Sequence, residues 1–273
     1  MASNLSCIGF AADGAAPIED LLRTVLPASE PVGRQDGVDV FRWEDASGAR
    51  LVISLRDGEV LDLLPSFAGR PGVRIADCHP LNADVAGAHV VDEDGEQTTA
   101  MAFGLEQRRA LAGRAPVAGI ASVIALGHDV SVHADEAAFA ASPRSLMNRN
   151  AEAEDPPTRA SELGLPWPPR MAAESFISYG VWGEPEQAEA YARLNGTVLA
   201  AEQRRNSLTG ADFHVCRVRT MDFEVDLLLD ARDHPEPPAP GQVVAATPYL
   251  VASIESLGFG TEEPPKRRWF GRR

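Results

Sequence analysis

Residues 194–254 decide the predicted fold; they begin Leu194-Asn195-Gly196-Thr197-Val198-Leu199 and end Tyr249-Leu250-Val251-Ala252-Ser253-Ile254. Apolar and β-branched residues predict strands at both of these ends, and three more at 213–220, 223–229 and 242–244. Residues of the 206–210 loop tolerate positive φ, and Pro240-Gly241 turns the chain into its next strand. Five short strands at this spacing predict a small closed barrel.

The order of these strands resembles the OB fold, a five-stranded Greek-key barrel that binds oligonucleotides, oligosaccharides or proteins. The resemblance rests on the strand rhythm and on the Pro240-Gly241 turn. The second predicted strand has a face that mixes aromatic, aliphatic and basic side chains: Phe213, Val215, Arg217 and Arg219. Such a face can stack bases, although a packed barrel interior also explains its aromatic residue, and the next strand carries the acids Glu224, Asp226 and Asp230.

The N-terminal seventy residues predict a βαβββ module over 5–64. A short strand at 5–10 precedes a helix that Pro17 opens and Pro27 ends, with apolar residues at helical spacing from Ile18 to Leu26. Strands follow at 38–43, 49–55 and 59–64, and Asp57-Gly58 is a hairpin signal between the last two.

This module is similar to half of a vicinal-oxygen-chelate domain, the fold of glyoxalases and extradiol dioxygenases. The likeness lies in Cys7-Ile8-Gly9-Phe10, in the helix, and in Asp45-Ala46-Ser47-Gly48-Ala49-Arg50. In metalloenzymes of that superfamily a His commonly occupies the position of Cys7, and a Glu lies near the position of Val52. Neither ligand is present here. We therefore expect no bound metal and no cofactor.

The remaining signals divide the chain into domains. Strands are predicted at 85–92 and 97–105, around Asp94-Gly95, and within 117–132 with a break at Gly127; Asp135 is a plausible helix N-cap. Residues 143–170 are rich in proline and turn residues, which is typical of a linker. After a strand at 176–182, Glu184-Pro185 opens a predicted helix that carries Ala188, Tyr191 and Ala192 and ends at Asn195-Gly196.

The predicted fold class is α+β and mainly β. We expect a mixed N-terminal domain over residues 1–142, a linker over 143–170, an OB-like barrel over 171–258 and a disordered basic tail over 259–273.

Charge is distributed unevenly along the 273 residues, which carry 40 acidic and 25 basic side chains. All 40 acids but only 20 of the basic residues lie in 1–265, a net of about −20 that repels phosphate backbones. The other five basic residues lie in the C-terminal tail, whose candidate binding residues are Lys266, Arg267, Arg268, Trp269, Phe270, Arg272 and Arg273. This tail suits anionic lipid or nucleic acid, or is a disordered solubilising end.

Composition indicates a soluble, cytoplasmic, bacterial protein. No window approaches the roughly 18 apolar residues of a membrane span, and the N-terminus lacks a secretory signal. The predominance of Arg and Ala suggests a GC-rich bacterial genome. The cysteines Cys7, Cys78 and Cys216 are odd in number and far apart, so we expect reduced, partly buried thiols.

Two groups of residues are candidates for chemistry. If residues 129–133 form a strand, its period of two places Asp129, Ser131, His133 and Asp135 on one face beside His128. Such a face could bind a metal or serve acid-base chemistry, or it is the solvated face of a half-buried strand. Cys78-His79 is a candidate thiol and base, but adjacent residues of an extended chain point in opposite directions.

These observations favour a non-enzymatic cytoplasmic adaptor that presents sheet edges or a barrel face to another protein. One alternative is a small-molecule binder or enzyme that uses the N-terminal domain through His128, Asp129, His133 and Asp135. Another is a weak nucleic-acid or anionic-membrane binder acting through the tail. The oligomeric state stays open.

Limited proteolysis tests the predicted linker. We expect the first cuts between Ser142 and Arg170, because this composition cannot form a core of its own. Mass spectrometry of the early fragments identifies the cut sites. First cuts within 194–254 would contradict the predicted division.

Overall fold

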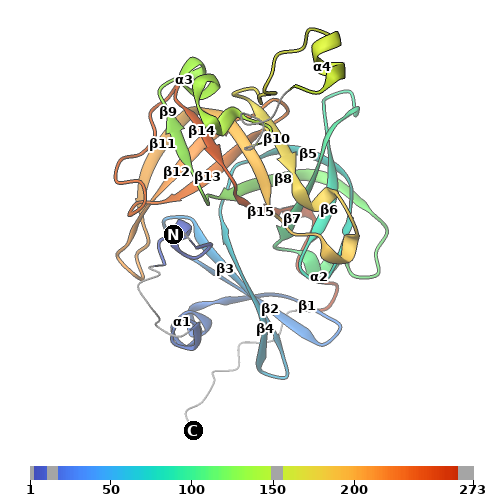
Figure 1. Ribbon diagram of the computed structural model, residues 1–273. Coiled ribbons are helices and arrows are strands. Elements are labelled where there is room, and N and C mark those ends of the chain that lie inside the picture. Colours follow the sequence, from blue (N-terminus) through green and yellow to red (C-terminus); the bar gives the residue numbers. More distant parts are fainter. Residues whose placement is uncertain (1–2, 11–17, 149–155, 264–273) are drawn as a thin grey trace.

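The computed structural model describes residues 3–10, 18–148 and 156–263. Within these residues the protein is mainly β and contains two sheets, with short helices around them (Figure 1). The smaller sheet is a four-stranded antiparallel meander whose strands lie in chain order. Its strands are β1 (Glu30–Gln35), β2 (Val38–Glu44), β3 (Ala49–Arg56) and β4 (Glu59–Phe67).

Part of the larger sheet closes into a five-stranded barrel. The strands of this barrel are β5 (Pro71–Pro80), β6 (Ala86–Val91), β7 (Gln97–Leu105), β8 (Val117–Leu126) and β15 (Tyr249–Ser253). They lie in the order β15-β7-β6-β5-β8, and antiparallel pairing of β15 with β8 closes the ring. The first sheet lies below this barrel in Figure 1.

The other strands extend the large sheet from β8. Their order is β13 (Glu224–Asp230), β12 (Asp212–Arg219), β11 (Ala192–Arg205), β14 (Val243–Ala246) and β9 (Ser131–His133), with β10 (Ser175–Ser178) also paired to β11. The strand next to β8 is β13, which runs parallel to it along Ile124, Ala125 and Leu126.

All five strands predicted within 194–254 are present, but they do not close a barrel by themselves. Thr247-Pro248 separates β14 from β15, and Pro248 has no amide hydrogen to continue a ladder. Consequently β14 pairs with β11, whereas β15 leaves that neighbour and pairs with β8 and β7. The closed barrel therefore takes four of its five strands from residues 71–126.

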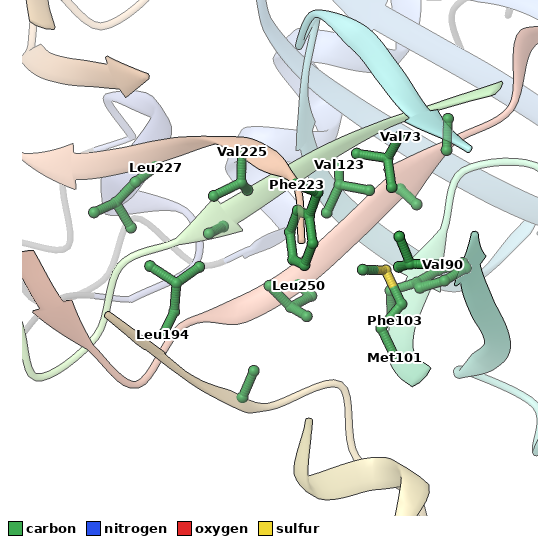
Figure 2. Close-up of a cluster of buried hydrophobic side chains, with 14 of the residues drawn as sticks. Val73, Val90, Met101, Phe103, Val123, Leu194, Phe223, Val225, Leu227 and Leu250 are labelled. Atoms are coloured by element: carbon green, nitrogen blue, oxygen red, sulfur yellow. The ribbon is translucent and has the colours of Figure 1, made fainter. Parts of the chain in front are cut away.

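One hydrophobic core joins the strands on both sides of the predicted linker (Figure 2). Val73, Val90, Met101, Phe103 and Val123 come from the first part of the chain, and Leu194, Phe223, Val225, Leu227 and Leu250 come from the second. Except for Phe223, each is at most 3% exposed. The sheet and its core thus cross the division that the sequence predicts at 143–170.

The ends of the predicted linker segment lie next to each other. Leu146 forms an isolated antiparallel bridge with Arg170, and the amide of Met171 donates to the carbonyl of Ser145 at 2.6 Å. The segment between them, which includes α4 (Thr158–Glu162), is called the excursion here, because its two ends meet at one point of the fold. Before it, Asp135 caps α3 (Glu136–Ala141) by accepting from the Ala138 amide at 2.8 Å, which confirms the predicted N-cap.

Local patterns predicted the N-terminal helix and three of the four meander strands correctly. The helix is α1 (Ile18–Val25), and both Asp57 and Gly58 adopt positive φ in the β3–β4 turn. The strand predicted at 5–10 is wrong, because Ser6–Ile8 is a 3-10 turn in which Ser3 and Ser6 each accept a hydrogen bond from the other's amide. Strand β1 was not predicted, because its residues Pro31 and Gly33 are of types that are uncommon in strands.

The helix predicted from Glu184-Pro185 is also wrong. Only a single 3-10 turn, Pro185–Gln187, forms, and Ala192 already belongs to β11. Tertiary hydrogen bonds hold the chain extended here. The Ala190 carbonyl accepts from the Leu250 amide at 2.8 Å, and the Ala192 amide donates to the Pro248 carbonyl at 3.1 Å. Tertiary pairing overrides the weak helical pattern.

A buried carboxylate fastens the meander sheet to the barrel. Glu106 follows β7, and its side chain is fully buried. Ser66 on β4 donates to its Oε1 at 2.5 Å, and the Arg50 Nη1 lies 3.6 Å from the same oxygen. The Arg42 Nη1 lies 4.0 Å from Oε2. Burial raises the pKa of Glu106, while Arg50 opposes that shift. A second contact of this interface joins Asp62 to Arg108 and Arg109.

Replacing Glu106 tests this attachment. Glu106→Ala removes the acceptor of the buried Ser66 hydroxyl and one counter-charge of Arg42 and Arg50. Both arginines keep Glu44 and Glu255 within 4.0 Å, so we expect the free energy of unfolding to fall by about 1–3 kcal/mol. Urea denaturation measures it. The control is Glu96→Ala in the exposed β6–β7 turn, which we expect to change stability by at most about 0.5 kcal/mol. Equal effects of the two substitutions would contradict the attachment.

Candidate functional site

The structure separates the residues predicted to share the face of one strand. Asp129 lies outside β9 in a left-handed turn with φ of 48°, and its Oδ2 accepts from the Arg144 Nη1 at 2.7 Å. Asp135 lies beyond the other end of β9 and caps α3. Only Ser131 and His133 keep the predicted spacing, and the Ser131 Oγ lies 3.0 Å from the His133 Nε2.

The histidines of this segment contact local neighbours. The His128 Nε2 lies 2.7 Å from the Asn4 Oδ1, which joins the N-terminal turn to the end of β8. The His133 ring packs edge-on against Phe139 at 5.5 Å, and burial lowers its pKa, assisted by Arg144. Among the described residues, no group of three or more His, Cys, Asp or Glu side chains is placed to hold a metal ion. The tail residues Lys266 to Arg273 lie outside the described part of the chain.

The Cys78-His79 pair has no geometry for nucleophilic chemistry. Cys78 is fully buried in the core, and burial raises the pKa of its thiol to about 12. His79 is turned to its own strand, where the Nδ1 lies 2.6 Å from the Asp77 carbonyl oxygen. Burial raises the pKa of Cys7 and of Cys216 to about 12 as well.

The best candidate for a site is a hollow on the outer face of β11, β12 and β13, which we call the arginine hollow. It has a volume of about 240 Å³, and the connection from β4 to β5 forms one of its walls. Its lining is Phe67, Ala68, Arg70, Ala200, Ala201, Glu202, Arg204, Val215, Arg217 and Asp226. The hollow thus lies between the end of the meander sheet and the large sheet.

Close contacts fix the wall formed by the β4–β5 connection. A Cβ on Gly69 would lie 2.6 Å from the Ile124 Cγ2, so only glycine lets the chain approach β8 this closely. The next amide, that of Arg70, donates to the Asp226 Oδ2 at 2.8 Å. Asp226 itself is nearly fully buried. The backbone at the edge of the hollow is therefore held to β13.

Arg204 fixes the opposite wall. Its Nη1 donates to the Ser47 carbonyl at 2.7 Å, and its guanidinium lies 5.2 Å from the centre of the Phe67 ring. On the same side chain, the Nε donates to the Glu202 Oε1 at 2.9 Å. A cation over an aromatic face at this distance is attracted by the ring. Arg204 therefore joins β11 to the meander sheet and neutralises Glu202.

The arginines of the hollow differ in their partners. Arg217 bonds Glu224 on β13 at 2.9 Å and Asp226 at 3.1 Å, and its side chain is only 13% exposed. Arg204 is bonded as described above. The Arg70 side chain is exposed and makes no ion pair or hydrogen bond with the described residues. The hollow therefore offers one cation that no carboxylate of the described chain neutralises.

A second hollow is too small to bind a substrate or a group of a partner protein. It has a volume of about 60 Å³ and is lined in part by Arg144, Arg193 and Asn195. The Asn195 Oδ1 is buried without a hydrogen-bond partner among the described residues. This volume corresponds to about two water molecules, so the hollow has no room for a larger ligand.

Sequence reasoning found one part of the arginine hollow and missed the rest. The face predicted for Phe213, Val215, Arg217 and Arg219 is divided in the structure. Phe213 and Val215 are buried beneath the meander sheet, Val215 and Arg217 line the hollow, and Arg219 bonds Glu174 at 2.8 Å. Nothing local in the sequence marks Arg70 or Arg204, because the walls they form are far apart in the chain.

Thiol alkylation tests the burial of the cysteines. Cys7, Cys78 and Cys216 are neutral at pH 7, because burial raises each pKa to about 12, and only the thiolate reacts. We expect iodoacetamide to label none of them in the folded protein and all of them in concentrated guanidinium chloride, as counted by mass spectrometry. Rapid labelling of native Cys78 would reopen its assignment as a nucleophile.

Comparison of the chain with protein-family models, curated proteins and solved structures finds no match. In the described part of the chain, no helix has the length and apolarity to cross a membrane. The inference of function therefore rests on the arginine hollow and on the strands that form it.

Proposed function

We propose that this chain is a cytoplasmic, non-enzymatic bacterial binding protein that holds another protein against the outer face of β11, β12 and β13. The observation that carries the proposal is the arginine hollow, with its unneutralised Arg70. A concave surface with a few convergent polar groups is the usual form of a binding site.

The position of the hollow supports this function. Strands β11, β12 and β13 correspond to the first three strands of the OB-like barrel predicted from the sequence, and β8 lies beside the third. OB folds bind their ligands on the face of the second and third strands. Here these strands are β12 and β13, which supply Val215, Arg217 and Asp226 to the hollow. The resemblance of the strands and the location of the hollow thus favour the same surface.

The size and chemistry of the hollow favour a group of a partner protein over a complete small-molecule substrate. Its volume of about 240 Å³ is below the roughly 300–1,000 Å³ of pockets that enclose drug-sized ligands. Its lining contains no Cys, Ser or His to act as nucleophile or base. Both lining carboxylates accept hydrogen bonds from the chain itself. These features suit recognition.

A substitution that fills the hollow tests the proposal. Ala200 lines the hollow and is exposed, so Ala200→Trp should occupy the space and prevent a partner from docking. We expect the immobilised full chain to retain a defined protein from extract of the source bacterium. Quantitative mass spectrometry should show at least about tenfold less of that protein on the variant, the loss expected when well over 1 kcal/mol of binding free energy is removed.

The matched control is Ala115→Trp, another exposed alanine, in the loop before β8. It should retain the partner as the unmodified chain does. The proposal would be overturned if all three chains retained the same protein in equal amounts. It would also be overturned if no retained protein were reduced on Ala200→Trp alone.

A further inference from the structure

One arginine of the arginine hollow forms no ion pair with the described residues, and this indicates the ligand of the hollow. Its lining carries three arginines and two carboxylates. Glu202 accepts from Arg204, and Asp226 accepts from Arg217 and from the Arg70 amide. Arg217 is neutralised further by Glu224, which lies outside the lining. With Glu224 included, three carboxylates balance the three arginines, but none of them forms an ion pair with the guanidinium of Arg70, which is therefore the group available to a ligand.

The surroundings of Arg70 prepare it to bind an anion. Its backbone is held by the hydrogen bond that the Arg70 amide donates to the Asp226 Oδ2 and by the close approach of Gly69 to Ile124, so the side chain starts from a fixed point. Arginine presents a planar fork of donors that matches the two oxygens of a carboxylate, and charge-assisted bonds of this kind are about twice as strong as neutral ones. The ligand group is therefore an oxyanion with at least two acceptor atoms.

The aromatic ring of the hollow is not free to stack a base. Arg204 covers one face of Phe67, and Phe213 packs edge-on against the same ring with centroids 6.2 Å apart. The net charge of −15 also repels a phosphate backbone, whose binding requires many free cations. A single carboxylate needs only one such cation. These constraints favour a single carboxylate of a protein over the many phosphates of a nucleic acid.

We propose that the arginine hollow recognises a carboxylate of the partner, either an acidic side chain or a chain terminus, through the guanidinium of Arg70 beside Arg204. This assignment rests on the proposed function and names the chemical group, a carboxylate, that the binding face recognises. The apolar part of the hollow, Ala200, Ala201 and Val215, contacts the carbon atoms that carry the carboxylate.

The test needs no partner protein. In two-dimensional amide NMR of the full chain, N-acetyl-glutamate N-methylamide supplies a side-chain carboxylate and N-acetyl-alanine supplies a terminal one. We expect saturable shifts of the Arg70, Ala201 and Arg204 amides with at least one probe. The probe that binds more tightly shows whether the carboxylate comes from a side chain or from a chain terminus. N-acetyl-glutamine N-methylamide, which has no charge, should give none.

Variants assign the effect to the guanidinium. Arg70→Ala should weaken the binding of the probe at least about tenfold, as expected for the loss of a hydrogen bond to a charged group. Arg70→Lys should retain part of it. The control is Arg74→Ala on β5, an exposed arginine outside the lining, which should bind normally.

A second variant leaves the arginines in place. Ala200→Glu introduces a carboxylate inside the hollow, so it should block the probes, whereas Ala200→Gln should block them less. Absence of saturable shifts with both carboxylate probes, shifts from inorganic phosphate or adenosine monophosphate alone, or unchanged binding in Arg70→Ala would each overturn the inference. A partner that Ala200→Trp releases but Arg70→Ala retains would overturn this inference and leave the proposed function intact.

Discussion

The pairing of strand β8 is the constraint on which the rest of the structure depends. Along one edge it pairs first with β5 and then, from Ile124 onward, with β13 in parallel; along the other edge it pairs with β15. The two faces of β8 are buried as well. Val123 and Ala125 lie in the core of the large sheet, and Ile124 and Leu126 lie in the core beneath the meander sheet. A strand buried on all sides must be continuously apolar, as residues 123–126 of β8 are.

This position of β8 explains why the chain folds as interleaved halves. The closed barrel needs β15, which arrives from the C-terminal part of the sequence, and β13 needs β8, which arrives from the N-terminal part. Most of these pairings join residues far apart in the sequence, and contacts of that kind form only after long loops have closed. The excursion between Leu146 and Arg170 adds little to this cost, because its ends meet.

The arginine hollow results from the way in which the meander sheet is attached. Ion pairs of the buried Glu106 and the partly buried Asp62 fasten the sheet, and separating a buried carboxylate from its arginines is costly, so these pairs fix where the sheet lies. The sheet then ends at Phe67, above the outer face of β11 and β12. The connection to β5 crosses that face through Gly69, which approaches β8, and Arg70, which is exposed and whose side chain forms no ion pair with the described residues. A carboxylate-binding hollow at this point is a product of how two sheets meet.

The sequence by itself determined the local structure wherever the signal was local. It predicted strand β7, the helix α1, the Asp135 cap and the Asp57-Gly58 turn, because hydrophobic period, capping and positive φ each act over a few residues. It also predicted that 194–254 contains five strands. Only the tertiary structure decided which of these strands close a barrel, why residues 184–192 form no α-helix, and that Arg70 and Arg204 line one hollow. Those outcomes depend on hydrogen bonds and burial between segments distant in the chain, and a pattern of neighbouring residues carries no information about such pairings.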